Sequence, residues 1–207
     1  MLRFMAAITS ALALWAGTLA AQVQVPQPAQ GQAVATFAGG CFWCVESDFD
    51  KVDGVLATTS GFMGGTTANP TYKQVTAGGT GHIEVVQIVF DPAKVSYQKL
   101  LDVFWRNVDP YDAGGQFCDR GDSYITAIFA HDEEQKRLAE ASKQALAPRA
   151  GSTTPPVTLV RDAGTFTPAE EYHQNYYKKN PVQYSFYRYS CGRDARLETL
   201  WGKPKTQ

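Results

Sequence analysis

The sequence predicts an α+β fold, in which helices cover a mixed β-sheet in a split α/β, ferredoxin-like arrangement, with an irregular C-terminal tail. Two observations favour this class. Stretches typical of strands alternate with stretches typical of helices from residue 33 onward, and no repeat of fixed period is present. The 207 residues are 44% hydrophobic and 19% charged, which suits one globular domain with a sizeable core.

Five stretches have the composition and length of strands. They are short and rich in apolar or β-branched residues, and they end at turn residues, as the clearest one ends at Asp91 and Pro92. In chain order the predicted strands are residues 33–38, 55–60, 82–90, 124–130 and 157–160.

Four helices are predicted between these strands. Gly39 and Gly40 form a tight turn before the first helix, so Cys41 opens it. Ser96 is a cap residue for an amphipathic helix, and Thr167 with Pro168 has the pattern of a capped helix start. The predicted helices are residues 41–51, 96–108, 132–146 and one that begins at 167–170. From about residue 185 the tail lacks regular periodicity.

The first 21 residues have the pattern of a secretory signal peptide. Arg3 supplies a positive charge, residues 6–19 are largely apolar, and the small residues Ala20 and Ala21 offer a cleavage site. Polar residues interrupt the apolar run, which is shorter than the roughly 20 residues of a membrane span. We therefore expect a cleaved signal peptide over 1–21, a flexible lead-in over 22–32, and one domain over 33–207. The mature protein would be periplasmic or secreted, without a membrane span.

Charge excludes one class of partner. Lys and Arg together number 19 and Asp and Glu number 20, giving a formal net charge of -1. A dedicated nucleic-acid binder would have a basic surface, so no nucleic-acid partner is expected. A monomer is expected.

Four cysteines, Cys41, Cys44, Cys118 and Cys191, would lie in an oxidising compartment after export. Two structural disulfides in a secreted binding module are one interpretation. The Cys-Phe-Trp-Cys run of the first two is atypical of structural bridges, and a thiol in the first turn of a helix faces unpaired N–H groups that favour the thiolate. Cys41 is therefore predicted to be a nucleophile with a lowered pKa. A thioredoxin-like disulfide oxidoreductase that uses Cys41 and Cys44 is the alternative.

The residues around Cys41 also belong to a longer pattern. Residues 40–43 read Gly-Cys-Phe-Trp, and further blocks follow in order. These blocks are Gly61, Gly64, Gly65, residues 69–72, 80–82, 84–86, 104–105 and 109–110, Asp119, Gly121, Tyr124, His173, Gln174 and Tyr176. Together they resemble the methionine sulfoxide reductase A family over residues 36–177. The resemblance implies reduction of methionine S-sulfoxide, protein-bound and free, to methionine, as repair of oxidised exported proteins.

The resemblance implies a role for each site residue. Cys41 would attack the sulfoxide sulfur, and Glu84 would protonate the oxygen, since its apolar strand should raise the pKa of its carboxyl. Tyr72 and Tyr124 would donate hydrogen bonds to that oxygen. Residues that would bind or surround the substrate are Phe42 and Trp43 as an apolar wall, with Asp119, His173 and Tyr176.

A sulfenic acid left on Cys41 must be converted to a disulfide by a second thiol. By analogy with the C-terminal cysteines of the family, Cys191 is the first choice, with Cys44 and Cys118 as alternatives. An external thiol reductant, a thioredoxin-like protein or dithiothreitol, would then recycle the disulfide, and no bound cofactor is expected. No metal is expected either, because the spacing of His82 and His173 relative to Cys41 and Cys44 matches no standard zinc pattern.

Overall fold

The computed structural model describes residues 23–146 and 154–203. The expected signal peptide lies outside these residues. The lead-in is described from Val23, and it contains no helix or strand before β1 begins at Ala33. Among the described helices, none is long and apolar enough to cross a membrane.

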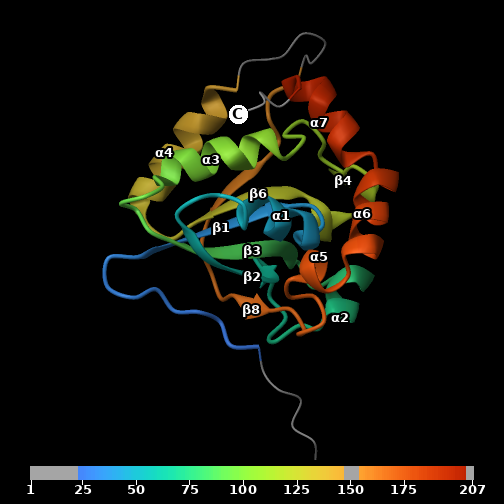
Figure 1. Cartoon of the computed structure of the whole chain (residues 1–207), viewed down its shortest axis with the longest axis horizontal. Coiled ribbons are helices and arrows are strands. Elements are labelled where there is room, and N and C mark those ends of the chain that lie inside the picture. Colours follow the sequence, from blue (N-terminus) through green and yellow to red (C-terminus); the bar gives the residue numbers. More distant parts are fainter. Residues whose placement is uncertain (1–22, 147–153, 204–207) are drawn as a thin grey trace, which may run out of the picture.

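A six-stranded sheet in the order β7-β6-β1-β3-β2-β8 forms the centre of the described chain (Figure 1). Its strands are β1 (Ala33–Gly39), β2 (Val55–Met63), β3 (Ile83–Phe90), β6 (Thr126–Ala130), β7 (Leu159–Asp162) and β8 (Thr167–Pro168). Neighbouring strands are antiparallel except for β6 and β7, which are parallel. The predicted mixed sheet is confirmed, and its central strand β1 leads directly into the helix that begins after Cys41.

Three helices bury the main core against one side of this sheet. They are α1 (Phe42–Phe49), α3 (Tyr97–Arg106) and α4 (Glu133–Gln144), and α3 and α4 lie side by side (Figure 1). Phe37 of β1 joins the layers, since its ring stacks on Phe49 at 5.2 Å and on Phe104 at 5.1 Å between centroids. Ser96 caps α3 as predicted, accepting a hydrogen bond from the Lys99 amide.

The tail is helical, which corrects the irregular tail predicted from the sequence. After α5 (Tyr176–Lys179), the predicted tail contains most of α6 (Pro181–Ser190) and all of α7 (Arg193–Trp201). Tyr184 and Trp201 are buried, so tertiary packing stabilises helices whose apolar periodicity is weak. Figure 1 shows α7, α6 and α5 following one another down the right side of the sheet.

Two further differences concern short elements. Thr167 and Pro168 form the edge strand β8, which pairs with Gly61 and Phe62, and they do not start a helix. An edge strand tolerates proline because one side of its backbone needs no partner. The short helix α2 (Tyr72–Ala77) and the hairpin of β4 (Gly115–Gln116) and β5 (Asp119–Arg120) were not predicted.

Candidate active site

Cys41 is the N-cap of α1 and is 6% exposed. Its carbonyl accepts hydrogen bonds from the amides of Cys44 and Val45, so the helix begins at this cysteine, as the sequence predicted. Gly40 sets the turn before it, with a φ of +78°, and a Cβ at this glycine would lie 2.5 Å from the Gln116 side chain. Only glycine fits this position without strain.

A cavity of about 190 Å³ adjoins the Cys41 thiol. Side chains from α1, α2, β3, the β4–β5 hairpin, a short 3₁₀ helix (Asp122–Tyr124) and α6 surround it. The lining residues are Cys41, Phe42, Trp43, Tyr72, Glu84, Asp119, Tyr124 and Tyr187. Seven of these eight were predicted site residues, and Tyr187 was not.

Glu84 is buried at the floor of this pocket. It lies on β3, is 2% exposed, and accepts a 3.0 Å hydrogen bond from the Phe42 amide. Burial raises the pKa of Glu84 to about 8, so the carboxyl is protonated at neutral pH. This finding confirms the expected raised pKa.

Two tyrosine hydroxyls meet beside Glu84. Tyr72 is the first residue of α2 and Tyr124 the last of the 3₁₀ helix, and both line the pocket together with Glu84. Burial raises the pKa of Tyr72 to about 12 and also raises that of Tyr124. Both are neutral hydrogen-bond donors over the physiological range.

His173 and Tyr176 hold Trp43 from outside the cavity. The Trp43 indole stacks on Tyr176 at 3.7 Å between ring centroids and donates a 3.1 Å hydrogen bond to Nδ1 of His173. Burial lowers the pKa of His173 to about 4, so this imidazole is neutral. These two residues position the indole, and they are not among the residues that line the pocket.

Cys41 and Cys44 form a buried pair of free thiols. Burial raises the pKa of Cys41, whereas the hydrogen bond with Cys41 lowers the pKa of Cys44 to about 7, helped by the charges of Arg193 and Arg188. The predicted lowering of the Cys41 pKa is therefore wrong for this substrate-free pocket. Cys44 is therefore the more acidic thiol of the pair, three residues along the chain from the predicted nucleophile.

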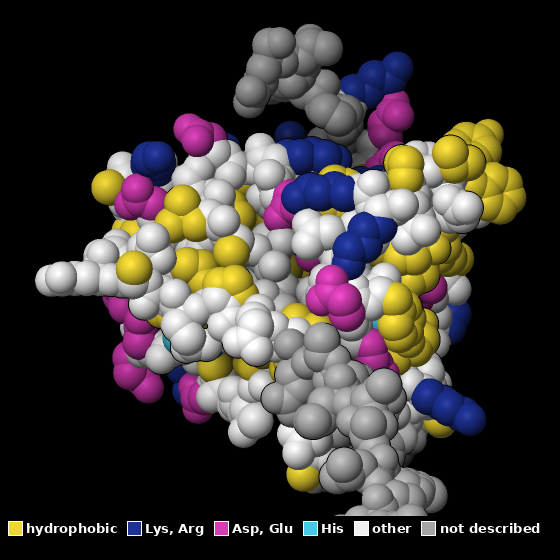
Figure 2. All heavy atoms as spheres, turned by 60° about the horizontal axis from the view of Figure 1, so that its bottom comes forward, with side chains coloured by type: hydrophobic (Ala, Val, Ile, Leu, Met, Phe, Trp, Pro, Cys, Tyr) yellow, Lys and Arg dark blue, Asp and Glu magenta, His cyan; other side chains and the backbone are white. Residues whose placement is uncertain are grey.

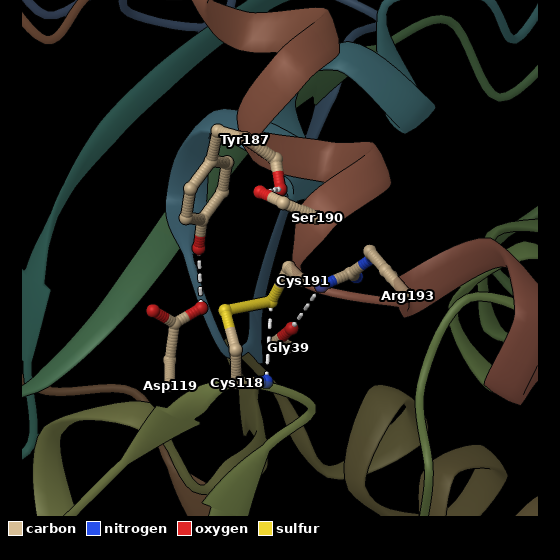
Figure 3. The surroundings of a disulfide bond; sticks show 7 residues. All are labelled: Gly39, Cys118, Asp119, Tyr187, Ser190, Cys191 and Arg193. Carbon is tan, nitrogen blue, oxygen red and sulfur yellow. Dashed lines mark hydrogen bonds between the residues drawn. A yellow bond between two sulfur atoms is a disulfide. The ribbon is translucent and has the colours of Figure 1, made fainter.

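Cys118 and Cys191 are joined by a disulfide bond, with 4.9 Å between their Cα atoms. The bond connects the β4–β5 hairpin to the junction of α6 and α7 (Figure 3). Cys191, the first choice for a resolving thiol, is thus not a free thiol in this structure. Cys118 is exposed.

The tail contributes Tyr187, which sequence reasoning missed. Pro181 at the first helical position, followed by Tyr184, Tyr187 and Cys191 at helical spacing, is the signal that could have predicted α6 and its inner face. Figure 3 shows the Tyr187 hydroxyl pointing to the Asp119 carboxylate, to which it donates a hydrogen bond.

Two groups resemble metal ligands without forming a site. His82 is engaged locally, with Nδ1 accepting from the Gly65 amide and Nε2 2.8 Å from the Thr67 carbonyl. In the described ranges, the one cluster of three potential ligands is Cys118, Asp119 and Cys191, and its two sulfurs are bonded to each other.

A thiol beside a buried, protonated carboxyl suits the reduction of a small substrate whose oxygen must be protonated as it leaves. The fold and the pocket therefore define a thiol-dependent oxidoreductase. Comparison with known proteins agrees with this class. A family model described as peptide methionine sulfoxide reductase matches residues 33–205.

Individual relatives cover most of the chain. The peptide methionine sulfoxide reductase MsrA of Bacillus licheniformis is 50% identical over 175 residues, which are 84% of this chain and 97% of the relative. Mxr1 from Saccharomyces cerevisiae in reduced form has a TM-score of 0.70 at 29% identity, over 75% of this chain and 90% of that one. Methionine sulfoxide reductase A of Corynebacterium diphtheriae has a TM-score of 0.67 at 32% identity, over 74% and 77%. The chain belongs to the peptide methionine sulfoxide reductase family, and it reduces methionine sulfoxide to methionine.

Proposed function

We propose that this enzyme reduces the S epimer of methionine sulfoxide, in proteins and as the free amino acid, with Cys41 as nucleophile. The observation that carries the proposal is the meeting of the Cys41 thiol, the protonated Glu84 carboxyl and two tyrosine hydroxyls in one small pocket. Phe42 and Trp43 line the same pocket and supply an apolar wall for the methyl group, with the aromatic contact that a sulfur-containing side chain favours.

The pocket supplies each component of the reduction. As the substrate enters, the Cys44 thiolate accepts the Cys41 proton, and the Cys41 sulfur attacks the sulfoxide sulfur. Glu84 donates its proton to the oxygen, which Tyr72 and Tyr124 bind by hydrogen bonds. The oxygen is transferred to Cys41 as a sulfenic acid and the thioether leaves, so methionine sulfur gains two electrons and Cys41 sulfur loses two.

We propose Cys44 as the first resolving thiol, in place of the initial choice, Cys191. Cys44 is a free buried thiol whose pKa the neighbouring Cys41 thiol lowers, while Cys191 is bonded to Cys118. Attack of the Cys44 sulfur on the sulfenic acid forms a Cys41–Cys44 disulfide and releases water. An external dithiol, a thioredoxin-like protein or dithiothreitol, then reduces the disulfide by thiol exchange. No bound cofactor takes part in this sequence.

The surface next to the pocket supports a polypeptide substrate. Helix α6 places Tyr187 in the pocket wall and exposes the apolar side chains of Val182 and Phe186 to solvent. Figure 2 shows hydrophobic side chains gathered along the right side of the molecule, the side on which α6 lies in Figure 1. Contiguous exposed apolar side chains are typical of surfaces that bind other chains. This exposed apolar surface and the signal-peptide pattern together support repair of oxidised exported proteins in the periplasm or outside the cell.

Incubation of the purified enzyme with each epimer of a methyl sulfoxide and excess dithiothreitol tests the proposal. We expect thioether from the S epimer and none from Cys41→Ser, because serine offers no comparable nucleophile. Substantial product from Cys41→Ser in a single turnover would end the proposed mechanism. Disulfide exchange on a test protein without thioether formation would instead support the thioredoxin-like alternative.

A further inference from the structure

Tyr187 lines the active-site pocket but has no role in the proposed reduction of the sulfoxide by Cys41 and Glu84. Its hydroxyl shares the pocket with the Cys41 thiol, whose pKa it lowers, and donates a hydrogen bond to Oδ2 of Asp119. Its ring stands edge-on to Trp43, with 5.7 Å between centroids and 79° between planes. One side chain of the C-terminal segment thus contacts three residues of the pocket.

The Cys118–Cys191 disulfide joins the two segments that carry Asp119 and Tyr187. Asp119 directly follows Cys118, and Tyr187 lies one helical turn before Cys191, so the disulfide and the Tyr187–Asp119 hydrogen bond form two parallel links between the same segments (Figure 3). The Cys118 amide also donates a 3.1 Å hydrogen bond to the Cys191 sulfur.

A third attachment lies just beyond the disulfide. The Arg193 guanidinium is 2% exposed and donates to the carbonyl of Gly39, at 3.1 Å, and to that of Asn107, at 2.7 Å. Gly39 ends β1, two residues before Cys41. The segment that carries Tyr187 is therefore tied both to the hairpin and to the strand that leads to the nucleophile.

We propose that Tyr187 is a further catalytic residue of the sulfoxide reduction and that the Cys118–Cys191 disulfide keeps its hydroxyl at the Cys41 sulfur. The inference rests on the proposed role of Cys41. In the substrate-free pocket the single hydroxyl proton is donated to Asp119. When the Cys41 thiolate forms, the same proton can turn to the sulfur without movement of α6, and it can then bind the sulfenic acid oxygen. The hydroxyl stabilises the reacting sulfur and transfers no proton, so the balance of the reaction is unchanged.

The first test compares Tyr187→Phe with Tyr189→Phe, a matched change at an exposed position of the same helix. Methionine formation in the first turnover is measured by rapid quench from pH 5 to 10. We expect Tyr187→Phe to slow this step about tenfold to 100-fold, the range for a lost hydrogen bond to a charged group. The pH at which the first-turnover rate increases should also be higher in this variant than in the wild type, because the Cys41 thiolate has lost a hydrogen-bond donor. A merely structural effect would slow the step without shifting this profile.

The second test places Tyr187→Phe in a Cys118→Ser/Cys191→Ser background. The first turnover needs no recycling thiol, so its rate isolates the structural effect of the disulfide. We expect the double serine variant to be slowed, and Tyr187→Phe to slow it by less than about twofold more, since both changes remove the same contact.

The outcomes separate this inference from the proposed function. If Tyr187→Phe has the rate and pH profile of Tyr189→Phe, Tyr187 is not catalytic. Fully additive effects in the serine background would exclude the disulfide as the element that positions it. Absence of methionine from the wild-type enzyme would contradict the proposed function itself.

Discussion

The Phe42 amide donates a 3.0 Å hydrogen bond to Oε2 of Glu84, which fastens the first turn of α1 to the buried carboxyl on β3. Because Phe42 follows Cys41, the proposed nucleophile and the proposed acid are held at a fixed separation by one bond between backbone and side chain. The contact uses one carboxyl oxygen and leaves the other for the acidic proton.

Glu84→Gln should bind substrate and reduce it about 10²–10⁴-fold more slowly at pH 7, the usual loss when a general acid is removed. The amide keeps the shape and can accept the bond from Phe42, but it cannot deliver a proton. Rapid-quench measurement of the first turnover checks this result. An unchanged rate would remove Glu84 from the acid role.

The wild-type first turnover should lose rate as pH rises through about 8. The pKa of Glu84 is raised to about 8 by burial, and only the protonated form can act as an acid. This decrease in rate should be absent from Glu84→Gln, whose residual rate does not depend on a carboxyl at position 84. A wild-type rate that stays flat from pH 7 to 10 would contradict the assignment.

Glu84→Gln should also change how stability depends on pH. The Glu84 pKa is about 8 in the folded protein and about 4.3 in an unfolded chain, so the folded state binds the extra proton and loses stability as pH rises between these values. The melting temperature of Glu84→Gln minus that of the wild type should therefore increase from pH 5 to pH 9. Glu46, whose pKa is also raised, is present in both proteins and cancels in the comparison. Parallel melting curves would show that Glu84 does not titrate in this range.

Cys44→Ser should form about one equivalent of methionine and then stall with a thioredoxin-like reductant. Reduction of the substrate needs the Cys41 sulfur, whereas a protein reductant needs a disulfide to attack. Mass spectrometry after dimedone treatment should detect the Cys41 sulfenic acid. Cys191→Ser and Cys118→Ser are the controls. Normal cycling of Cys44→Ser together with stalling of Cys191→Ser would restore Cys191 as the resolving residue.

Gly40→Ala should destabilise the protein more than Gly78→Ala does. Both glycines have positive φ, +78° and +83°, but a Cβ at Gly40 would meet the Gln116 side chain at 2.5 Å and one at Gly78 would meet nothing within 4 Å. The overlap should add about 1–3 kcal/mol to the shared backbone cost. Urea unfolding measures the difference, and equal losses would show that Gln116 moves aside freely. Gly40→Ala should also slow the first turnover, because the turn positions Cys41.

The amino-acid sequence alone determined the features that depend on neighbours along the chain. Gly39 and Gly40 between an apolar strand and a helical stretch placed Cys41 at a helix start. The raised pKa of Glu84 was predicted from its apolar strand together with the resemblance to the family. The ordered blocks around them identified the family and most of the residues that line the pocket.

Only the tertiary structure decided which distant groups meet. Four cysteines allow three pairings, and the bond between Cys118 and Cys191, 73 residues apart, depends on how α6 packs beside the β4–β5 hairpin. The same packing brings Tyr187 to Cys41. It also places two arginine side chains where their charges favour a thiolate at Cys44 over one at Cys41. Burial and electrostatic interactions depend on distances in space. The spacing of residues along the chain does not give those distances for residues in different helices and strands.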